Sequence, residues 1–361
     1  MIVLLRSADY EYDSRLRKYI KVLEEESKDF IVLHWPRNRK VEDTNNLLSC
    51  KERATYGGKF ANLMGYFKWF VFLFAYLFNH RKEIKIIHAI DFDTGIVSLV
   101  MKLLFNKNYI YEIYDHYADS RNLKGSARKV INGIEKIIAK KAKSVVLVDK
   151  ARIEQHKFSE NLSIKIIENV PNFSVTRQQF ETQNSERLSL CYVGVLEKQH
   201  RGLENLLKVA EKLPVELHIA GFGGVESLFK NCQFANVHFY GSVNHERAQE
   251  LMQGCDLMLG LYYLSNHNHF YASPNKYYEH LALGKPLLTS KGTPPGDKVA
   301  KYNTGWAIGD SYNELYKVLS EIIAGKKQEL VEKGSNAYNV WQNNYSNYHL
   351  TLKSTYLDLV D

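Results

Sequence analysis

The chain has 361 residues, of which 45% are hydrophobic and 24% are charged, and this balance excludes a disordered or fibrous protein. The length suffices for two domains that each bury their own core. The four cysteines, at positions 50, 191, 232 and 255, form no metal-ligand spacing, which argues against a cysteine zinc site and favours a reducing compartment. We expect no secretory signal, because the apolar run Met1–Leu5 is followed at once by Arg6.

The net charge of +8 is concentrated in the first half of the sequence. Residues 1–180 carry ten more basic than acidic side chains, whereas residues 181–361 carry two more acidic than basic ones. A basic half of this kind could serve nucleic acid, an anionic membrane or a phosphorylated acceptor. We find no nucleic-acid-binding motif, and the basic residues are scattered through predicted helices, so we expect no nucleic-acid partner.

Apolar runs alternate with helical segments along the first half, the pattern of a doubly wound α/β domain. The predicted strands are Ile2–Leu5, Phe30–His34, Ile84–Ala89, Tyr109–Ile113, Ser144–Val148 and a short one near Ile164–Ile167. A polar stretch without periodicity follows, so we predict a first Rossmann-like domain over residues 1–172 and a linker over 173–187.

The alternation restarts after the linker and predicts a second Rossmann-like domain over residues 188–340. Its predicted strands are Leu188–Val193, Val215–Ala220, Val237–Tyr240 and Leu257–Leu261, with helices over Gly202–Leu213 and Glu246–Gln253. The last segment, about Ser335–Leu359, has aromatic and aliphatic residues at helical spacing and predicts an amphipathic terminal helix.

The segment Ser273–Pro286, SPNKYYEHLALGKP, carries the clearest functional pattern. Ser273 is a good N-cap before Pro274, so a helix should begin here and end at Gly284. Lys276 lies in its first turn, where free N–H groups and the helix dipole favour an anion, and Glu279 shares that face. A cation beside N–H groups suits a phosphate and a carboxylate suits a ribose diol, which together describe a nucleoside diphosphate.

This segment resembles the donor-binding signature of the family 4 glycosyltransferases, which belong to the glycosyl transferases of group 1. The resemblance implies the GT-B fold: two facing Rossmann-like domains, with a C-terminal helix (about 341–361) that crosses back to the first. It also implies retaining, metal-independent transfer of a sugar from a nucleoside diphosphate sugar to a glycan or a polyprenyl or other lipid-linked acceptor. We expect a role in bacterial surface polysaccharide or glycoconjugate synthesis, no cofactor, acceptor binding by the first domain, and reaction in the cleft between the domains.

Several further residues resemble the donor site of that family. Gly194 opens a loop that ends at Arg201, which could bind the diphosphate with two N–H groups, although Val195 stands where the family usually has arginine. The predicted donor-binding residues are Gly194, Arg201, Gly221, Gly223, Ser242, Ser273, Asn275, Lys276 and Glu279. The glycines could equally be ordinary tight turns. Tyr271 stands where many family members have a first glutamate, seven residues before the second.

In the first domain, Asp115 and His116 end a predicted strand, where open α/β sheets place their ligands. His116 resembles the family's histidine beside the donor sugar, so the predicted catalytic residues are His116, Arg201 and Lys276. Arg15 and Asp115 are the predicted acceptor-binding residues, with a plainer alternative in which Asp13 or Ser14 caps a helix and Arg15 is solvated.

Asp91 and Asp93 could form the DxD metal motif of another glycosyltransferase fold, but Asp93 could equally cap a helix over residues 94–104, and we expect no metal.

Ten consecutive apolar residues, Trp69–Phe78, are too few for a membrane span of about 20. A helix that is apolar all round is either buried or inserted into a membrane surface. Basic residues surround it, at positions 51, 53, 59, 68, 81, 82 and 85. We therefore expect a cytoplasmic protein, with peripheral binding to the inner face of an anionic membrane as one alternative and a core helix as the other. A sugar-nucleotide epimerase-like enzyme and a non-catalytic membrane-associated relative are the competing functions.

Overall fold

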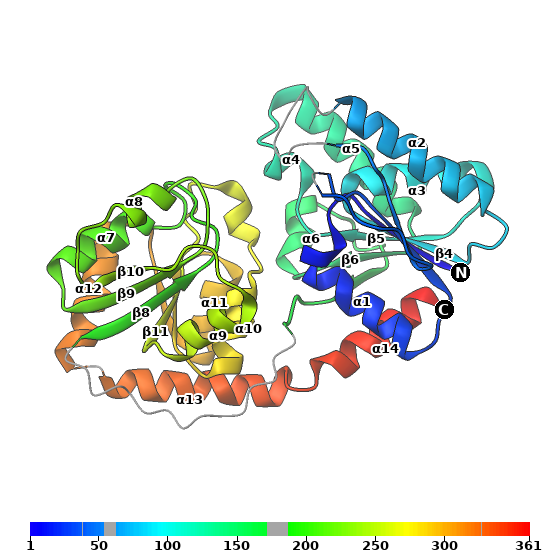
Figure 1. Cartoon of the computed structure of the whole chain (residues 1–361). Helices are drawn as coiled ribbons and strands as arrows, with labels where there is room; N and C mark the ends of the chain where they lie inside the picture. The colour runs from blue at the N-terminus through cyan, green and yellow to red at the C-terminus, as the bar shows by residue number, and fades with distance from the viewer. Residues whose placement is uncertain (38, 54–62, 172–186, 326) are drawn as a thin grey trace. The chain divides into compact units, whose positions relative to one another are not determined.

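The computed structural model describes residues 1–361 except 38, 54–62, 172–186 and 326. The predicted linker lies outside the described residues apart from Arg187, and so does Lys59 of the basic flank. The chain divides into two compact units, which we call unit 1 (Met1–Asn169 and Leu350–Asp361) and unit 2 (Val170–His349). Each unit is a parallel sheet with helices on both faces (Figure 1).

Unit 1 is built on a seven-stranded sheet in the order β3-β2-β1-β4-β5-β6-β7. Its strands are β1 Ile2–Arg6, β2 Phe30–His34, β3 Leu47–Ser49, β4 Ile86–Ile90, β5 Tyr109–Ile113, β6 Ser144–Leu147 and β7 Ile164–Ile166. Its helices are η1 Tyr10–Tyr12, α1 Ser14–Glu25, α2 Leu63–Asn79, α3 Asp91–Phe105, α4 Tyr117–Ser120, α5 Gly125–Lys141, α6 Ala151–His156 and α14 Tyr348–Val360.

The central strands of this sheet are buried on both faces, as parallel strands covered by helices should be. Alternate residues of β1, such as Val3 and Leu5, belong to a core with Trp69 and Leu73 of α2. The α2, α3 and α5 helices lie on this face of the sheet, and α1 and α14 lie on the other (Figure 1).

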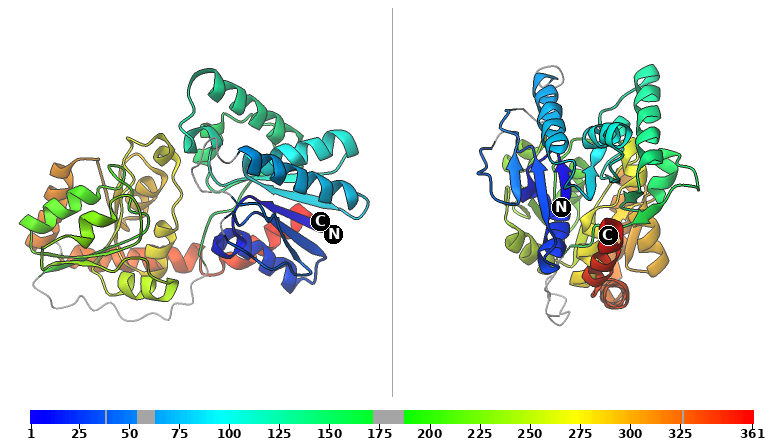
Figure 2. Two further views of the ribbon diagram at one scale, coloured as in Figure 1. Left: turned by 45° about the horizontal axis from the view of Figure 1, so that its top comes forward. Right: turned by 90° about the vertical axis from the view of Figure 1, so that its right-hand side faces the viewer.

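The last helix, α14, belongs to unit 1 although the preceding 180 residues form unit 2. Tyr356 packs its ring 4.4 Å from the ring of Tyr19 in α1, and its hydroxyl lies 3.1 Å from His88 Nδ1 in β4. The two ends of the chain lie close together (Figure 2), and Asp361 pairs with Lys28 at 2.8 Å. The predicted return of the terminal helix to the first domain is confirmed.

Unit 2 is built on a six-stranded parallel sheet in the order β10-β9-β8-β11-β12-β13. Its strands are β8 Leu188–Val193, β9 Val215–Ala220, β10 Val237–Phe239, β11 Leu257–Gly260, β12 Leu287–Ser290 and β13 Gly305–Ile308. Its helices are α7 Leu203–Lys212, α8 Glu226–Lys230, α9 His245–Gln253, η2 His267–Tyr271, α10 Asn275–Leu283, α11 Pro294–Tyr302, α12 Tyr312–Gly325 and α13 Lys327–Asn344.

Two separate cores cover the two faces of this sheet. Leu188, Leu190 and Tyr192 of β8 pack with α7, α8 and α12, whereas Cys191 of the same strand packs with α9, α10, α11 and α13. This alternation follows from the two-residue period of a strand. The α/β class and doubly wound architecture predicted from the sequence are therefore confirmed.

Three local predictions need correction. The terminal segment is two helices, α13 and α14, because Tyr345 N and Ser346 N both bond back to Trp341 O and close the first helix. The N-cap of α10 is Pro274 rather than Ser273, and the cap makes no side-chain bond. Asp93 lies inside α3, which begins at Asp91, so it is not a cap.

Candidate functional site

The strand order of unit 2 reverses between β8 and β11, which are neighbours in the sheet. In open α/β sheets the carboxyl ends of the strands at such a reversal form the usual ligand site. Gly194 follows β8, Gly221 follows β9, and Tyr262 lies two residues after β11. Several predicted donor-binding residues therefore lie at one edge of one sheet.

The backbone is closely packed at this edge because glycine occupies the contact points. A Cβ atom on Gly221, whose φ is +145°, would lie 1.8 Å from the carbonyl oxygen of Gly194. A Cβ on Gly223 would lie 2.6 Å from the carbonyl oxygen of Leu196. Gly221 N also donates to Gly241 O at 2.8 Å. These glycines do lie in tight turns, as the alternative proposed. The turns also contact one another at the carboxyl ends of β8 and β9.

Two cationic side chains, Arg201 and Lys276, lie at this glycine-lined edge. Each makes a cation–π contact with a tyrosine ring. The guanidinium of Arg201 lies 4.5 Å from the ring centre of Tyr262. The amine of Lys276, in the first turn of α10, lies 5.2 Å from the ring centre of Tyr192. A Cβ on Gly194 would lie 3.5 Å from that amine, so the lysine covers the turn after β8. Cation–π contact fixes both charges while leaving N–H groups for a ligand.

Burial shifts the pKa values of Lys276 and Glu279 in α10. Desolvation lowers the pKa of Lys276, while the charge of Glu279, three residues further along the helix, opposes that shift. Desolvation likewise raises the pKa of Glu279, and Lys276 opposes it. An incoming anion beside Lys276 would favour its charged form.

The sequence did not reveal Glu197, Tyr192 or Tyr262 as members of this site. Glu197 Oε2 lies 3.2 Å from Arg201 Nε and 4.0 Å from His269 Nε2. The spacing of four residues between Glu197 and Arg201 is visible in the sequence, but it falls in a loop, where spacing does not predict contact. The tyrosines could have been suspected from their positions at strand ends.

The remaining predicted donor residues lie around this centre. Ser273 and Asn275 are half-buried at the start of α10, and Tyr271 ends the short helix η2 just before it. Ser242 is exposed in the loop between β10 and α9, next to Gly241. The loop continues into α9, where Asn244 caps the helix by accepting from Arg247 N at 2.9 Å.

The sheet of unit 1 has its own reversal, between β1 and β4, and ion pairs that the sequence did not predict lie there. Arg6 pairs with Asp13 at 2.7 Å and with Asp91. Asp91 also accepts from Tyr114 N at 2.9 Å, and its φ of +71° is unusual for a residue other than glycine. Burial raises the pKa of Asp91 to about 6.

Asp93, its partner in the DxD pattern, faces the core and accepts from Trp69 Nε1 at 3.2 Å.

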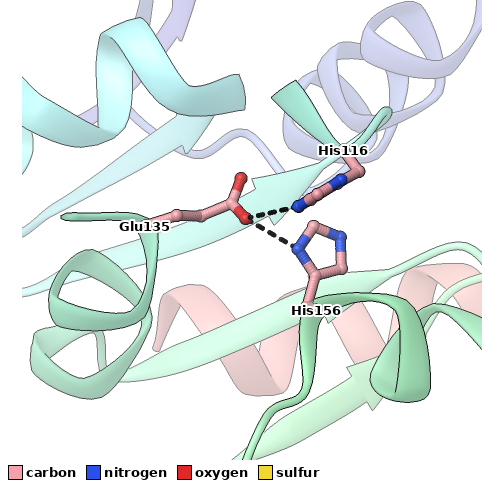
Figure 3. Close-up of side chains that lie close together, drawn as sticks. All are labelled: His116, Glu135 and His156. Atoms are coloured by element: carbon pink, nitrogen blue, oxygen red, sulfur yellow. Dashed lines mark hydrogen bonds and ion pairs between the residues drawn. The ribbon is translucent and has the colours of Figure 1, made fainter. Parts of the chain in front are cut away.

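The predicted site residues of unit 1 lie in different surroundings. His116 is 1% exposed and lies close to Glu135 (Figure 3) and to Asp119, whereas Asp115 is 57% exposed and pairs with Arg152.

Arg15 is buried, donates to Ile167 O at 2.8 Å and pairs with Glu112, so the alternative of a solvated arginine is wrong. Asp13 does cap α1, as that alternative proposed, by accepting from Leu16 N at 2.9 Å. The contacts of Arg15 and His116 are those of interior ion pairs, and their roles toward a substrate stay predictions.

The family model "Glycosyl transferases group 1" matches residues 175–339, which include every residue of the unit 2 site described above. A search of curated proteins gives no significant match. Solved structures do resemble the whole chain. A sucrose-phosphate synthase from Thermosynechococcus elongatus has a TM-score of 0.74 and 16% identity, over 99% of both chains.

Two further structures give similar agreement. WaaG, a glycosyltransferase involved in lipopolysaccharide biosynthesis, has a TM-score of 0.69 and 13% identity, over 100% of this chain and 99% of its own. HepE from Anabaena, in complex with UDP, has a TM-score of 0.67 and 14% identity, over 98% of both chains. At such identities the likeness shows the GT-B fold alone. Residues 175–339 thus match the group 1 glycosyltransferases, and the chain as a whole has the GT-B fold.

Proposed function

We propose that the protein transfers a sugar from a nucleoside diphosphate sugar to a glycan or lipid-linked acceptor in bacterial surface polysaccharide or glycoconjugate synthesis. The observation that carries the proposal is the pair of tyrosine-supported cations, Arg201 and Lys276, over the glycine-lined edge of unit 2. HepE has been solved with UDP and with UDP-glucose, so a uridine nucleotide is the first donor to test.

The roles of the side chains follow from their chemistry. Arg201 and Lys276 would bind the diphosphate, and Glu279 would accept from ribose hydroxyls. As the glycosidic bond breaks, negative charge grows on the leaving diphosphate, and fixed cations beside it stabilise that charge. The same two cations supply the positive charge that a metal ion provides in other transferases, so we propose a metal-independent reaction. Retention of the anomeric configuration is proposed from the family resemblance.

Replacement of Lys276 by methionine tests this assignment. The variant keeps the length of the side chain but loses the charge, so kcat/KM for the donor should fall by a factor on the order of 100 to 1000. The assay measures release of nucleoside diphosphate, with product analysis by mass spectrometry. Lys208→Met on the exposed face of α7 is the matched control and should keep full activity.

Unchanged turnover in Lys276→Met would contradict the role of Lys276. A sugar nucleotide converted without any acceptor would instead identify an epimerase-like enzyme, and nucleotide binding without turnover would identify a non-catalytic relative.

We also propose that unit 1 binds the surface of an anionic membrane through α2. In the described part of the chain no helix combines the length and apolarity that crossing a bilayer requires. One face of α2 packs into the core through Trp69, Leu73 and Leu77. The opposite face carries Met64, Phe67, Val71, Phe74 and Phe78, which are between 36% and 64% exposed. Their alternating spacing of three and four residues places them in one stripe.

This apolar stripe continues onto the end of α3, where Leu103 and Leu104 are both 63% exposed. The rings of Phe78 and Phe105 lie 5.4 Å apart and join the two helix ends. Basic side chains border the stripe, and Arg81 lies 4.2 Å from the ring centre of Phe78. Apolar side chains with a cationic border suit an interface of anionic lipid, where a lipid-linked acceptor would also lie.

Sedimentation with vesicles tests this proposal. Val71→Glu should reduce the fraction bound to vesicles of anionic phospholipid several-fold, while Val331→Glu, on the exposed face of α13, should bind as the wild type does. Binding of wild type to neutral vesicles should be weaker than to anionic ones. Equal sedimentation of the two variants would contradict the docking role of α2, without bearing on donor turnover.

A further inference from the structure

A buried cluster in unit 1 has no role in the function proposed above. It consists of His116 in the loop before α4, Glu135 in α5 and His156, the last residue of α6 (Figure 3). All three side chains are buried. One ligand-type atom from each residue lies within 4.8 Å of the others, which makes this, among the described residues, a group able to hold a metal ion.

Glu135 stands between the two imidazoles. Its Oε2 atom lies 2.8 Å from His156 Nδ1 and 3.7 Å from His116 Nε2. The second carboxylate oxygen, Oε1, accepts from the hydroxyl of Tyr111 at 3.4 Å. A single carboxylate oxygen is thus aimed at a nitrogen of each histidine.

The surroundings of the other ring nitrogen of His116, Nδ1, bear on what lies between Nε2 and Glu135. His116 Nδ1 is 2.8 Å from Asp119 Oδ2, and the other oxygen of Asp119 pairs with Arg128 at 2.7 Å. With the ring proton on Nδ1, the nitrogen beside this carboxylate, the lone pair of Nε2 would point toward the carboxylate of Glu135. Two electron-rich atoms face each other in a buried place, an arrangement that requires a positive charge between them.

We propose that this charge is a zinc ion bound by His116 Nε2, Glu135 Oε2 and His156 Nδ1. Zinc binds imidazole nitrogen and carboxylate oxygen at about 2.0–2.2 Å in tetrahedral geometry, which separates its ligand atoms by roughly 3.3–3.5 Å. The distances of 2.8 and 3.7 Å bracket that value. Asp119 fits the carboxylate that usually orients a zinc-bound histidine.

The site has three protein ligands, so a water molecule would complete the tetrahedron, and the site would hold segments together rather than act on a substrate. It joins the loop after β5 to α5 and α6, so the ion would fix three parts of unit 1 that lie between β5 and β7. None of the four cysteines belongs to it, which is why cysteine spacing gave no sign of a zinc site. The inference is independent of the proposed function, because it concerns metal content and not sugar transfer.

Metal analysis of the full-length protein after dialysis against low micromolar zinc tests the site. Wild type should retain about one zinc per chain, and His156→Ala should lose it. His238→Ala is the control, because His238 stacks on His218 beside Glu216 and could bind zinc adventitiously at the surface. That variant should retain the ion. Retention by His156→Ala, loss by His238→Ala, or no stoichiometric zinc in wild type would overturn the proposal.

A second measurement remains decisive if His156→Ala fails to fold. Wild type loaded with Co²⁺ should show the intense visible absorption of a tetrahedral site, and Glu135→Gln should lose or shift that band. The unfolding temperature of wild type should rise with zinc until the site is saturated. A weak octahedral spectrum, or no change in unfolding temperature, would overturn the proposal.

Discussion

Arg201 and Glu197 form the most telling contact at the scale of single residues. The carboxylate of Glu197 occupies Arg201 Nε, one of the donors that a phosphate would use. The guanidinium remains fixed on Tyr262 by its cation–π contact. A bound diphosphate must therefore compete with Glu197 for Arg201, so this carboxylate sets how tightly the nucleotide binds.

Glu197→Gln should strengthen the binding of nucleoside diphosphate. An ion pair that solvent still reaches contributes only about 0.2–1 kcal/mol, so we expect the dissociation constant for UDP to fall by a factor of up to about five. Isothermal titration calorimetry with UDP measures it. Glu204→Gln in the first turn of α7 changes charge by the same amount nearby, and it should have the smaller effect. Weaker UDP binding by Glu197→Gln would instead mean that the carboxylate contacts the donor.

At the scale of secondary-structure elements, Glu112 joins three elements of unit 1. It lies fully buried in β5, pairs with Arg15 of α1, and accepts from His88 Nε2 at 2.9 Å and from the hydroxyl of Tyr19 at 2.9 Å. His88 then accepts from Tyr356 of α14. Burial opposes ionisation of Glu112, but Arg15, His88 and Tyr19 outweigh it and lower its pKa to about 2.

This network predicts a loss of stability in acid. The folded-state pKa of Glu112 is below the ordinary value of 4.5, so its stabilisation is complete above about pH 4.5 and disappears as the pH falls toward 2. The shift corresponds to about 3 kcal/mol at neutral pH. Urea unfolding of wild type and Glu112→Gln at pH 7 and pH 3 measures it, with Glu24→Gln on the exposed face of α1 as control. A difference between wild type and Glu112→Gln that does not shrink at pH 3 would refute the assignment.

The sequence predicted the positions of helices and strands better than it predicted which side chains contact one another. Strands such as Ile2–Leu5 were found because a buried parallel strand is a continuous apolar run, and the end of α10 at Gly284 was found because a left-handed residue there favours glycine. The break between α13 and α14 was missed, since aromatic spacing continues through it.

Side-chain partners in the candidate site could not be read in the same way. Arg15 looked like a free cation because its partner, Glu112, is 97 residues away. Lys276 and Glu279 were found because helical spacing joins them. Glu197 was missed, and Asp91 was considered only as a metal ligand, because only the folded loops bring them to Arg201 and Arg6.

At the scale of the whole molecule, the contacts of the donor site come from unit 2, whereas α14 completes the core of unit 1. Leu359 is 2% exposed and packs in that core. Binding of the nucleotide and the stability of unit 1 should therefore be separable.

Leu359→Ala tests this separation. A buried leucine replaced by alanine costs about 2–5 kcal/mol, and we expect that loss in unit 1. The affinity for UDP at 25 °C should stay within twofold of wild type, because Gly194, Arg201 and Lys276 lie in the other unit. Denaturant unfolding measures the stability, and titration of the same preparation with UDP measures the affinity. A joint loss of stability and affinity would show that the units depend on each other for donor binding.

The return of α14 also has a consequence for biosynthesis. Unit 1 is discontinuous, since residues 170–349 come between its main part and its last helix. Domains generally fold from the N-terminus as they leave the ribosome. Here that order is reversed for completion of the core, because Tyr356, Leu359 and Val360 are translated after the whole of unit 2. Unit 2 can finish folding first, while unit 1, which is made first, has one face of its sheet covered only in part until α14 follows.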